Sequence, residues 1–233
     1  VNSLSLFAGI GGIDLALERA GINVVAAVEI DKAARGVVRD RFPHVALFDD
    51  VTKVTGDQLR DAGFVPGRGI VAAGWPCQGN SVAGRRQGMD DARSGLWMHV
   101  ARLLAELRPR WFLGENVPGL LSVNDGRDFG TVLTDLADCG MGFAWRVLDA
   151  QHFGVPQRRR RVFIVGHLGD RTAPVQALFE PESSGGDSAA RRATGTPVAG
   201  TLGSRVGGSR TTDLDGHGAY VPGTVNTLRG EGD

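Results

Sequence analysis

The sequence has few cysteines, few lysines and no long hydrophobic run, and each shortage excludes a class of protein. Its two cysteines, Cys77 and Cys139, have neither a metal-ligand spacing nor a disulfide framework, so we expect no metal and a reducing compartment. We find no signal peptide and no apolar run long enough to span a bilayer, which predicts no membrane partner. The formal net charge is zero, so no overall field draws the chain to nucleic acid.

Arginine supplies almost all of the positive charge. Lys32 and Lys53 are the only lysines among the 26 lysine and arginine side chains. The planar guanidinium suits two-point contact with phosphates and base edges, although a GC-rich coding sequence produces the same bias. At 233 residues the chain is long enough for one large domain with a sizeable core.

The N-terminal part of the chain has the pattern of a strand, a glycine turn, a helix and a second strand. The strands are residues 4–8 and 24–28, and between them lie Gly9-Ile-Gly-Gly12 and the helical spacing of residues 13–20. In doubly wound folds such a unit binds a nucleotide, and an acid at the position of Glu29 holds the ribose hydroxyls. The glycines alone would fit a tight turn about as well as a nucleotide-binding loop, and Glu29 at this distance favours the loop. The turn lacks the third glycine that binds a pyrophosphate, which disfavours a dinucleotide and favours S-adenosylmethionine.

A second acidic group follows a short predicted strand at residues 45–47. Asp50 stands just after this strand, where it could accept a hydrogen bond from an adenine amino group. It could equally cap the helix predicted to begin near Asp57. The sequence leaves both interpretations open.

The stretch from Gly74 to Ala83 contains the candidate nucleophile. Residues 68–73 are apolar and predict a buried strand, which Pro76 prevents from continuing. Cys77 comes next, in a polar loop near Arg85, and electropositive surroundings favour the reactive thiolate. An isolated cysteine is more often a small buried hydrophobe, which is the role we expect for the second cysteine.

Glu115 follows another apolar strand, residues 110–114. The carboxyl ends of parallel strands share one edge of a sheet, so Glu29, Cys77 and Glu115 are expected to converge there. The alternative role of Glu115 is to cap the segment that follows it.

Four consecutive arginines, Arg158–Arg161, lead into the strand predicted at residues 162–165. In an extended chain Arg159 and Arg161 point to one face, and we expect one such pair to face the cleft. A basic surface patch is the alternative.

The character of the chain changes near residue 171. Residues 181–233 contain 12 glycines and little periodicity, so they have no core of their own. We predict a catalytic domain that binds S-adenosylmethionine at residues 1–170. Residues 171–233 are then a glycine-rich linker or the beginning of an incomplete target-recognition region.

These motifs, in this order, resemble those of the DNA (cytosine-5)-methyltransferases. The resemblance covers residues 4–168 and rests on Phe7-Ala-Gly-Ile-Gly-Gly12, Glu29, Asp50-Val-Thr52, Pro76-Cys-Gln78, Glu115-Asn-Val117 and Gln157-Arg-Arg-Arg-Arg161 with Phe163. It implies an α/β fold with a doubly wound, mostly parallel sheet, that is, a Rossmann-like methyltransferase. It also implies S-adenosyl-L-methionine as cofactor and double-stranded DNA as partner.

The resemblance further implies a role for individual residues. The catalytic set is Cys77, Glu115, Arg159 and Arg161. The cofactor-binding set is Phe7, Gly9, Gly11, Gly12, Glu29, Ile30, Asp50, Val51, Pro76 and Leu96. The substrate-binding set is Gln78, Ser81, Arg85 and Asn116. A metal ion has no place in this set.

The reaction implied is methyl transfer to C5 of a cytosine flipped out of the duplex. The Cys77 thiolate would add to C6, while Glu115 would hydrogen-bond N3 and the exocyclic amine. Arg161, with Arg159, would hold the base O2 and orient Glu115. Residues 85–95 are the candidate for a loop that closes over the base.

Nothing in the sequence matches the target-recognition domain and the last two motifs of the family. We therefore expect either a fragment or one half of a split enzyme whose second polypeptide supplies the rest, and we doubt sequence-specific methylation by this chain alone. The expected setting is the cytoplasm of a bacterium, with a bacterial or phage-encoded protein at the nucleoid, in restriction-modification or a related role. The alternatives are a tRNA cytosine-5 methyltransferase, a non-catalytic module that binds cofactor or DNA, and a nicotinamide dehydrogenase.

Overall fold

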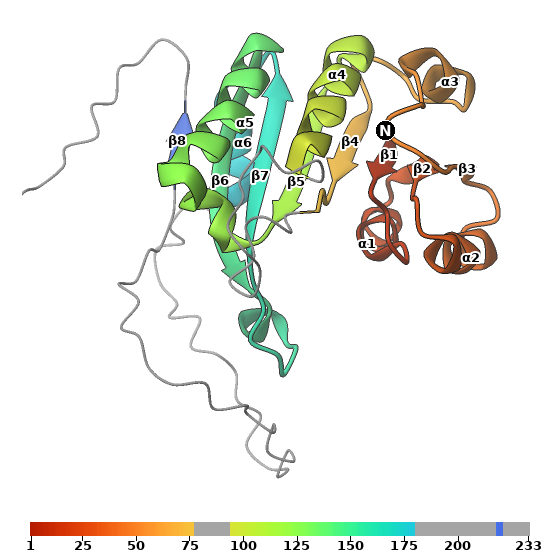
Figure 1. Ribbon diagram of the computed structural model, residues 1–233, viewed down its shortest axis with the longest axis horizontal. Helices are drawn as coiled ribbons and strands as arrows, with labels where there is room; N and C mark the ends of the chain where they lie inside the picture. The colour runs from red at the N-terminus through yellow and green to blue at the C-terminus, as the bar shows by residue number, and fades with distance from the viewer. Residues whose placement is uncertain (77–93, 180–217, 221–233) are drawn as a thin grey trace, which may run out of the picture.

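The computed structural model describes residues 1–76, 94–179 and 218–220 (Figure 1). The strands are β1 (Asn2–Leu6), β2 (Asn23–Val28), β3 (Ala46–Phe48), β4 (Ile70–Ala73), β5 (Trp111–Asn116), β6 (Met141–Asp149), β7 (Arg160–Leu168) and β8 (Gly218–Tyr220). The α-helices are α1 (Gly12–Arg19), α2 (Lys32–Arg41), α3 (Gly56–Asp61), α4 (Trp97–Leu107), α5 (Arg127–Asp138) and α6 (Ala173–Leu178). The 3-10 turns are η2 (Ser94–Leu96), η3 (Pro118–Leu121), η4 (Val123–Gly126) and η5 (Ala150–Phe153).

The strands form one sheet in the order β3-β2-β1-β4-β5-β7-β6-β8. The first five strands of the chain pair in parallel, while β7 runs antiparallel between β5 and β6. A parallel pair needs a crossover, which the helices supply, whereas β6 and β7 are joined as a hairpin. The expected doubly wound, mostly parallel fold is confirmed.

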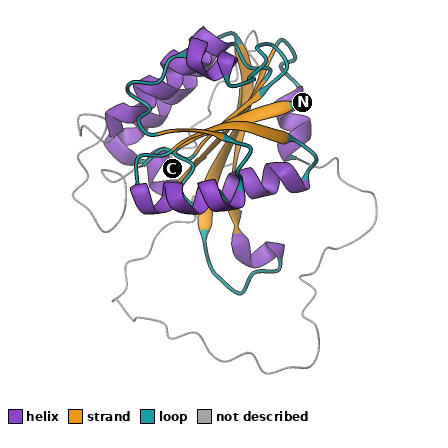
Figure 2. Ribbon diagram, turned by 90° about the vertical axis from the view of Figure 1, so that its right-hand side faces the viewer, coloured by secondary structure: helices purple, strands orange, loops and turns teal. Residues whose placement is uncertain are grey.

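Helices cover both faces of the sheet (Figures 1 and 2). On one face Leu4, Val71 and Phe112 pack against the buried side of α3, α4 and α5. On the other face small residues such as Ala27 and Ala72 lie under α1 and α2. Cys139 packs at the edge of the larger core, and burial raises the pKa of its thiol, which fits the packing role expected for it.

The beginning of α3 decides one question that the sequence left open. Thr55 is the N-cap of this helix and forms a capping box with Gln58, in which each side chain bonds to the other's backbone. The helix therefore does not use Asp50 as its cap, and that interpretation is wrong. A threonine with glutamine three residues later is the sequence signal that identifies the cap.

The register of the parallel strands places the expected site residues on one rim of the sheet. The last residues of β3, β2, β1 and β4 align in one row with Gly114 of β5: Phe48, Val28, Leu6, Ala73 and Gly114. Glu29 and Glu115 each follow a residue of this row, and so does Gly74. The two acids therefore stand at the same edge of the sheet, at the ends of β2 and β5, with β1 and β4 between them.

The described part of the C-terminal region packs onto the main sheet. Helix α6 lies against β6 and β7, with Arg146 donating to the Leu178 carbonyl, and β8 pairs with β6. The domain boundary at residue 170 stays a prediction. Among residues 1–76, 94–179 and 218–220, no helix has both the length and the apolar character to cross a bilayer.

A buried carboxylic acid lies between α1 and β1. Asp14, in the first turn of α1, is 1% exposed, and the hydroxyl of Ser5 on β1 is close to it. No atom pair there has hydrogen-bond geometry, so both carboxyl oxygens and the Ser5 hydroxyl are buried without a partner. Burial raises the pKa of Asp14 above its ordinary value of 3.8, and the Ser5 hydroxyl offsets only part of that effect.

This raised pKa predicts a pH-dependent gain from removing the charge. The folded protein holds the Asp14 proton more tightly than the unfolded chain, so Asp14 costs stability as the pH rises from 3.8 to the folded-state pKa. We expect Asp14→Asn to raise the melting temperature at pH 8 by about 2–4 °C, the effect of about 1 kcal/mol at this size. The difference is expected to shrink towards pH 4. Asp40→Asn on exposed α2 is the control, and an unchanged or lower melting temperature for Asp14→Asn at pH 8 contradicts the prediction.

Candidate active site

The loop between β1 and α1 has three left-handed residues. Phe7, Gly9 and Gly11 have φ of +59°, +56° and +84°. A side chain at Gly11 would also place its Cβ 2.5 Å from the ring of Phe42, so only glycine fits there. Phe7 has no such freedom, and a strained non-glycine residue at a sheet edge is typical of a functional loop. Gly12 then begins α1.

Glu29 ties this loop to the loop that follows β2. One carboxylate oxygen accepts from the Gly9 amide at 2.7 Å, and the other accepts from the Asp31 amide at 2.7 Å. Glu29 is 9% exposed, whereas Ile10 and Ile30 beside it are 66% and 73% exposed. An acid between two uncovered apolar side chains fits an adenosine, which has hydroxyls on the ribose and an apolar base face. These residues therefore fit the expected cofactor.

In the turn after β3, the carboxylate of Asp50 is engaged by neighbouring residues of the same turn. Asp50 Oδ1 accepts from the Thr52 amide at 2.9 Å and hydroxyl at 2.7 Å, and Oδ2 pairs with Lys53 at 3.0 Å. The Thr52 hydrogen bonds, with Lys53, lower the pKa of Asp50 to about 2. One lone pair of Oδ2 remains for an adenine amino group. The Val51 side chain is buried, so a cofactor contact of this residue involves its backbone.

Glu115 lies beside two arginines, Arg161 of β7 and Arg159 in the segment just before it. Arg161 Nε lies 2.9 Å from Glu115 Oε1, and Arg159 Nη2 lies 3.8 Å from the same oxygen. Antiparallel pairing of β5 with β7 creates this contact, and the alternation of side chains puts both arginines on one face, as expected. Glu115 has its other oxygen 3.5 Å from where a Cβ of Gly74 would be, so the end of β4 also adjoins it.

A pocket of about 310 Å³ opens beside this charged group. Its walls are Glu115, Arg159 and Arg161 together with Leu148, Ala150, Phe153 and Phe163. Phe153 is 64% exposed at the turn of the β6–β7 hairpin, which extends beyond the sheet in Figure 1. The lining residues Leu148, Ala150 and Phe153 have no signal in the sequence, since a pocket between paired strands depends on contacts between distant segments.

Asn116 holds the segment that leads to the candidate nucleophile. It is 2% exposed, and its Nδ2 donates to the Trp75 carbonyl at 3.2 Å while its Oδ1 accepts from the Val117 amide at 2.8 Å. Trp75 is buried and its ring packs at 4.7 Å on Trp97 of α4. Both the nitrogen and the oxygen of the Asn116 side-chain amide are hydrogen-bonded inside the protein, so Asn116 fixes the position of the Trp75 backbone. Buried amides usually pair internally, and these contacts give Asn116 a structural role, while its expected substrate contact stays a prediction.

Several expected site residues lie outside the described part of the chain. These are Cys77, Gln78, Ser81 and Arg85, with most of the expected loop at 85–95. Pro76 is half-buried at the same rim as Glu115, and Leu96 packs partly against the core at the start of α4. The roles of these residues stay predictions.

Comparison with known proteins agrees with this geometry. A family model for the C-5 cytosine-specific DNA methylases matches residues 1–196. The type II methyltransferase M2.BsuMI of Bacillus subtilis is 37% identical over 185 residues, and M.XorII of Xanthomonas oryzae is 40% identical over 184 residues. These matches cover 78% and 76% of this chain but 45% and 42% of the relatives, so the chain spans less than half of their length.

Solved structures give the same result. A protein described as a DNA modification methyltransferase encoded within an E. coli prophage superposes with a TM-score of 0.62 at 30% identity, over 72% of this chain and 47% of that one. The Dnmt2 methyltransferase of S. pombe, at 24% identity and a TM-score of 0.58 over 73% and 51%, shares the fold.

The fold and the rim of the sheet define a Rossmann-like methyltransferase of the class that depends on S-adenosylmethionine. Within that class, the chain belongs to the C-5 cytosine-specific DNA methylase family.

Proposed function

We propose that this chain binds S-adenosyl-L-methionine and methylates C5 of cytosine in double-stranded DNA. The observation that supports it most is the shared rim: Glu29 holds the glycine loop at one end, and Glu115 with Arg161 forms a charged group at the other. A methyl donor and an activated pyrimidine need to meet at one edge, and this arrangement offers a subsite for each.

The cofactor subsite follows from the loops after β1, β2 and β3. Glu29 binds the ribose hydroxyls, Ile30 covers the base, and Asp50 accepts from the adenine amino group. Phe7, Gly9, Gly11 and Gly12 bring backbone close to the ligand, with Val51, Pro76 and Leu96 at the border of the subsite. When bound, the cofactor supplies the electrophilic methyl group that C5 accepts.

The chain's own residues make C5 nucleophilic. The Cys77 thiolate adds to C6 and forms a C–S bond. The electron pair of the C5–C6 double bond shifts to C4–C5, that of the C4–N3 double bond shifts to N3, and the Glu115 carboxyl group gives its proton to N3. Arg161 and Arg159 hold Glu115 and the base O2. After C5 is methylated, a base removes its proton, the C–S bond breaks, and the thiolate leaves with the bonding pair.

DNA is the partner that the family implies, and the rest of the substrate site is a proposal. Gln78, Ser81 and Arg85 contact the substrate, and the base lies at the mouth of the pocket beside Glu115. Target recognition comes from a longer form of this polypeptide or from a second polypeptide. The type II methyltransferases among the bacterial relatives support a role in restriction-modification, in the cytoplasm and at the nucleoid.

A trapping experiment tests this function. DNA with 5-fluorocytosine cannot lose a proton from C5, so the covalent adduct with Cys77 is expected to persist and to survive denaturation. The chain is assayed with and without S-adenosylmethionine, alone and together with a polypeptide that carries the target-recognition part of the family.

We expect an adduct that requires the cofactor and disappears in Cys77→Ser. tRNA of matched length, assayed for methyl transfer, distinguishes the RNA-modifying alternative. Cofactor binding without any adduct in either preparation contradicts catalysis and supports the binding module. Competition by NAD and not by S-adenosylhomocysteine would support the dehydrogenase.

A further inference from the structure

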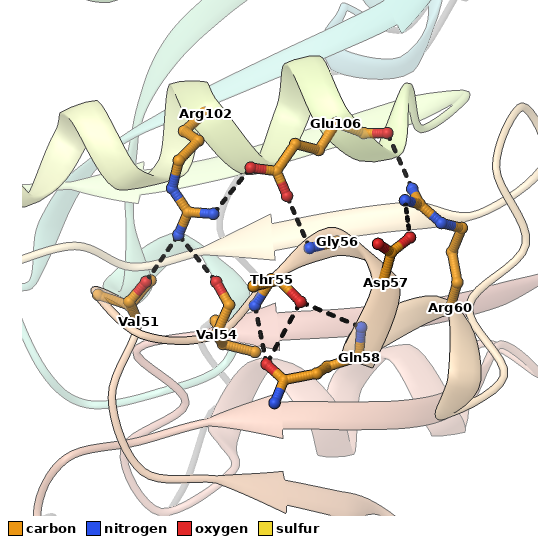
Figure 3. Close-up of polar contacts among 9 residues, drawn as sticks. All are labelled: Val51, Val54, Thr55, Gly56, Asp57, Gln58, Arg60, Arg102 and Glu106. Carbon is orange, nitrogen blue, oxygen red and sulfur yellow. Dashed lines mark hydrogen bonds and ion pairs between the residues drawn. The ribbon is translucent and has the colours of Figure 1, made fainter.

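One arginine on α4 fastens the turn that follows β3 (Figure 3). Arg102 Nη2 donates to the Val51 carbonyl at 3.1 Å and to the Val54 carbonyl at 2.9 Å. Its Nη1 forms an ion pair with Glu106, one helical turn further on, at 2.9 Å. The guanidinium therefore connects α4 to two backbone carbonyls of the loop. A lysine ammonium is a compact point charge and lacks the planar fork of donors that makes these contacts together.

Glu106 fastens the other end of the same turn. Its second carboxylate oxygen accepts from the Gly56 amide at 2.6 Å, and its backbone carbonyl accepts from Arg60 at 3.0 Å. A side chain at Gly56 would place its Cβ 2.9 Å from the Glu106 Cβ, so the loop and helix are in close contact there. Residues 51–56 are thus attached to α4 at both ends (Figure 3).

The attached turn begins with an acid of the proposed cofactor subsite. Hydrogen bonds from Thr52 and an ion pair with Lys53, both inside the turn, set the direction of the Asp50 carboxylate. Those contacts are local and do not place the turn relative to Glu29 on the neighbouring strand. The contacts of Arg102 do, because α4 packs on the sheet through its buried side chains.

The same helix also adjoins the proposed catalytic subsite. Trp97, at its beginning, packs on Trp75 and donates to Asp135 of α5 at 2.6 Å. Helix α4 therefore contacts the adenine-side turn through Arg102 and the segment before Cys77 through Trp97. The two contacts lie at different turns of one rigid helix, so they can be perturbed separately.

We propose that Arg102 is a positioning residue for the cofactor, which sets the adenine side of the site by holding the Val51 and Val54 carbonyls. This inference rests on the proposed function, since it needs the turn at Asp50 to contact the adenine. Arg102 does not touch the reacting atoms.

Calorimetric titration of the full chain with S-adenosylmethionine and with S-adenosylhomocysteine tests the proposal. We expect Arg102→Leu to raise both dissociation constants about tenfold and by the same factor, because the two ligands share the adenosine. Arg102→Lys is expected to recover part of the affinity, since an ammonium reaches one carbonyl but not two and Glu106 together.

Arg60→Leu is the matched control. Arg60 belongs to the same network but bonds to the Glu106 carbonyl and to Asp57, and not to residues 51–54. We expect the cofactor affinity of Arg60→Leu to stay within about twofold of wild type. Its melting temperature is expected to fall about as much as that of Arg102→Leu. If Arg102→Leu is unfolded by circular dichroism, Arg102→Lys is used in its place and is expected to bind about threefold more weakly.

The outcomes separate this inference from the function on which it rests. A wild-type chain that binds neither ligand contradicts the proposed function. A wild-type chain that binds, together with Arg102 variants of equal affinity, contradicts only the role of Arg102. Equal losses in Arg102→Leu and Arg60→Leu also overturn it, since they would reflect general destabilisation.

Discussion

Replacing Glu29 with alanine is expected to raise the dissociation constant for S-adenosylmethionine by about 100-fold, or about 2.8 kcal/mol. Two losses add up in this variant. The ribose loses a charged acceptor, a type of hydrogen bond that contributes about 1.5–3 kcal/mol. The loops after β1 and β2 also lose their shared anchor, because the carboxylate accepts from both Gly9 and Asp31.

Glu29→Gln distinguishes these two losses. A glutamine amide keeps one acceptor, but its NH₂ group would face either the Gly9 or the Asp31 amide, and two donors repel. We therefore expect Glu29→Gln to fall between wild type and Glu29→Ala in a calorimetric titration. Cys77→Ala is the control, with unchanged affinity because the thiol belongs to the other subsite. Equal loss of affinity in Cys77→Ala and Glu29→Ala would show that the two subsites are not separate.

Glu115→Gln is expected to lower the rate of methyl transfer to DNA by about 100- to 1,000-fold, the range found when a donor that stabilises developing charge is removed. Glutamine fills the same space but cannot protonate the ring nitrogen, and it forms no ion pair with Arg161. The fold is expected to survive, because Glu115 lies at the rim and is 22% exposed.

The measurement is the initial rate of radiolabel transfer, in the preparation in which the wild-type chain forms the 5-fluorocytosine adduct. Cofactor affinity serves as the internal control and is expected to be unchanged in Glu115→Gln. A rate close to wild type would mean that Glu115 only caps the end of β5. A parallel loss of cofactor affinity would instead indicate a disturbed rim.

Local patterns predicted most of the elements of this fold. The helix at α4 and the strand at β4 are visible as periodicities, and the ends differ from the expected ones by a residue or two. The expected strand at residues 110–114 continues to Asn116, so Glu115 lies inside β5 near its end. Pairing with β7 lengthens this strand, because Glu115 and Asn116 find partners in Phe163 and Val162.

Side-chain roles were harder to predict than elements. Asn116 looks polar and available in the sequence, but in the structure it is buried against Trp75. Arg102 looks like an ordinary charge on an amphipathic helix, yet it holds two backbone carbonyls of another segment. Neither role has a local signal, because each depends on which strand ends lie beside which helix.

The sequence by itself determined the order of strands and helices, the glycine turn, and the motifs that identify the family, since all of these depend on residues close together in the chain. Only the tertiary structure decided that Arg159 and Arg161 lie beside Glu115 and that α4 holds the turn at residues 51–56. These contacts arise from the register between strands distant in the sequence and from the packing of helices on them, and both are set by burial of the whole core.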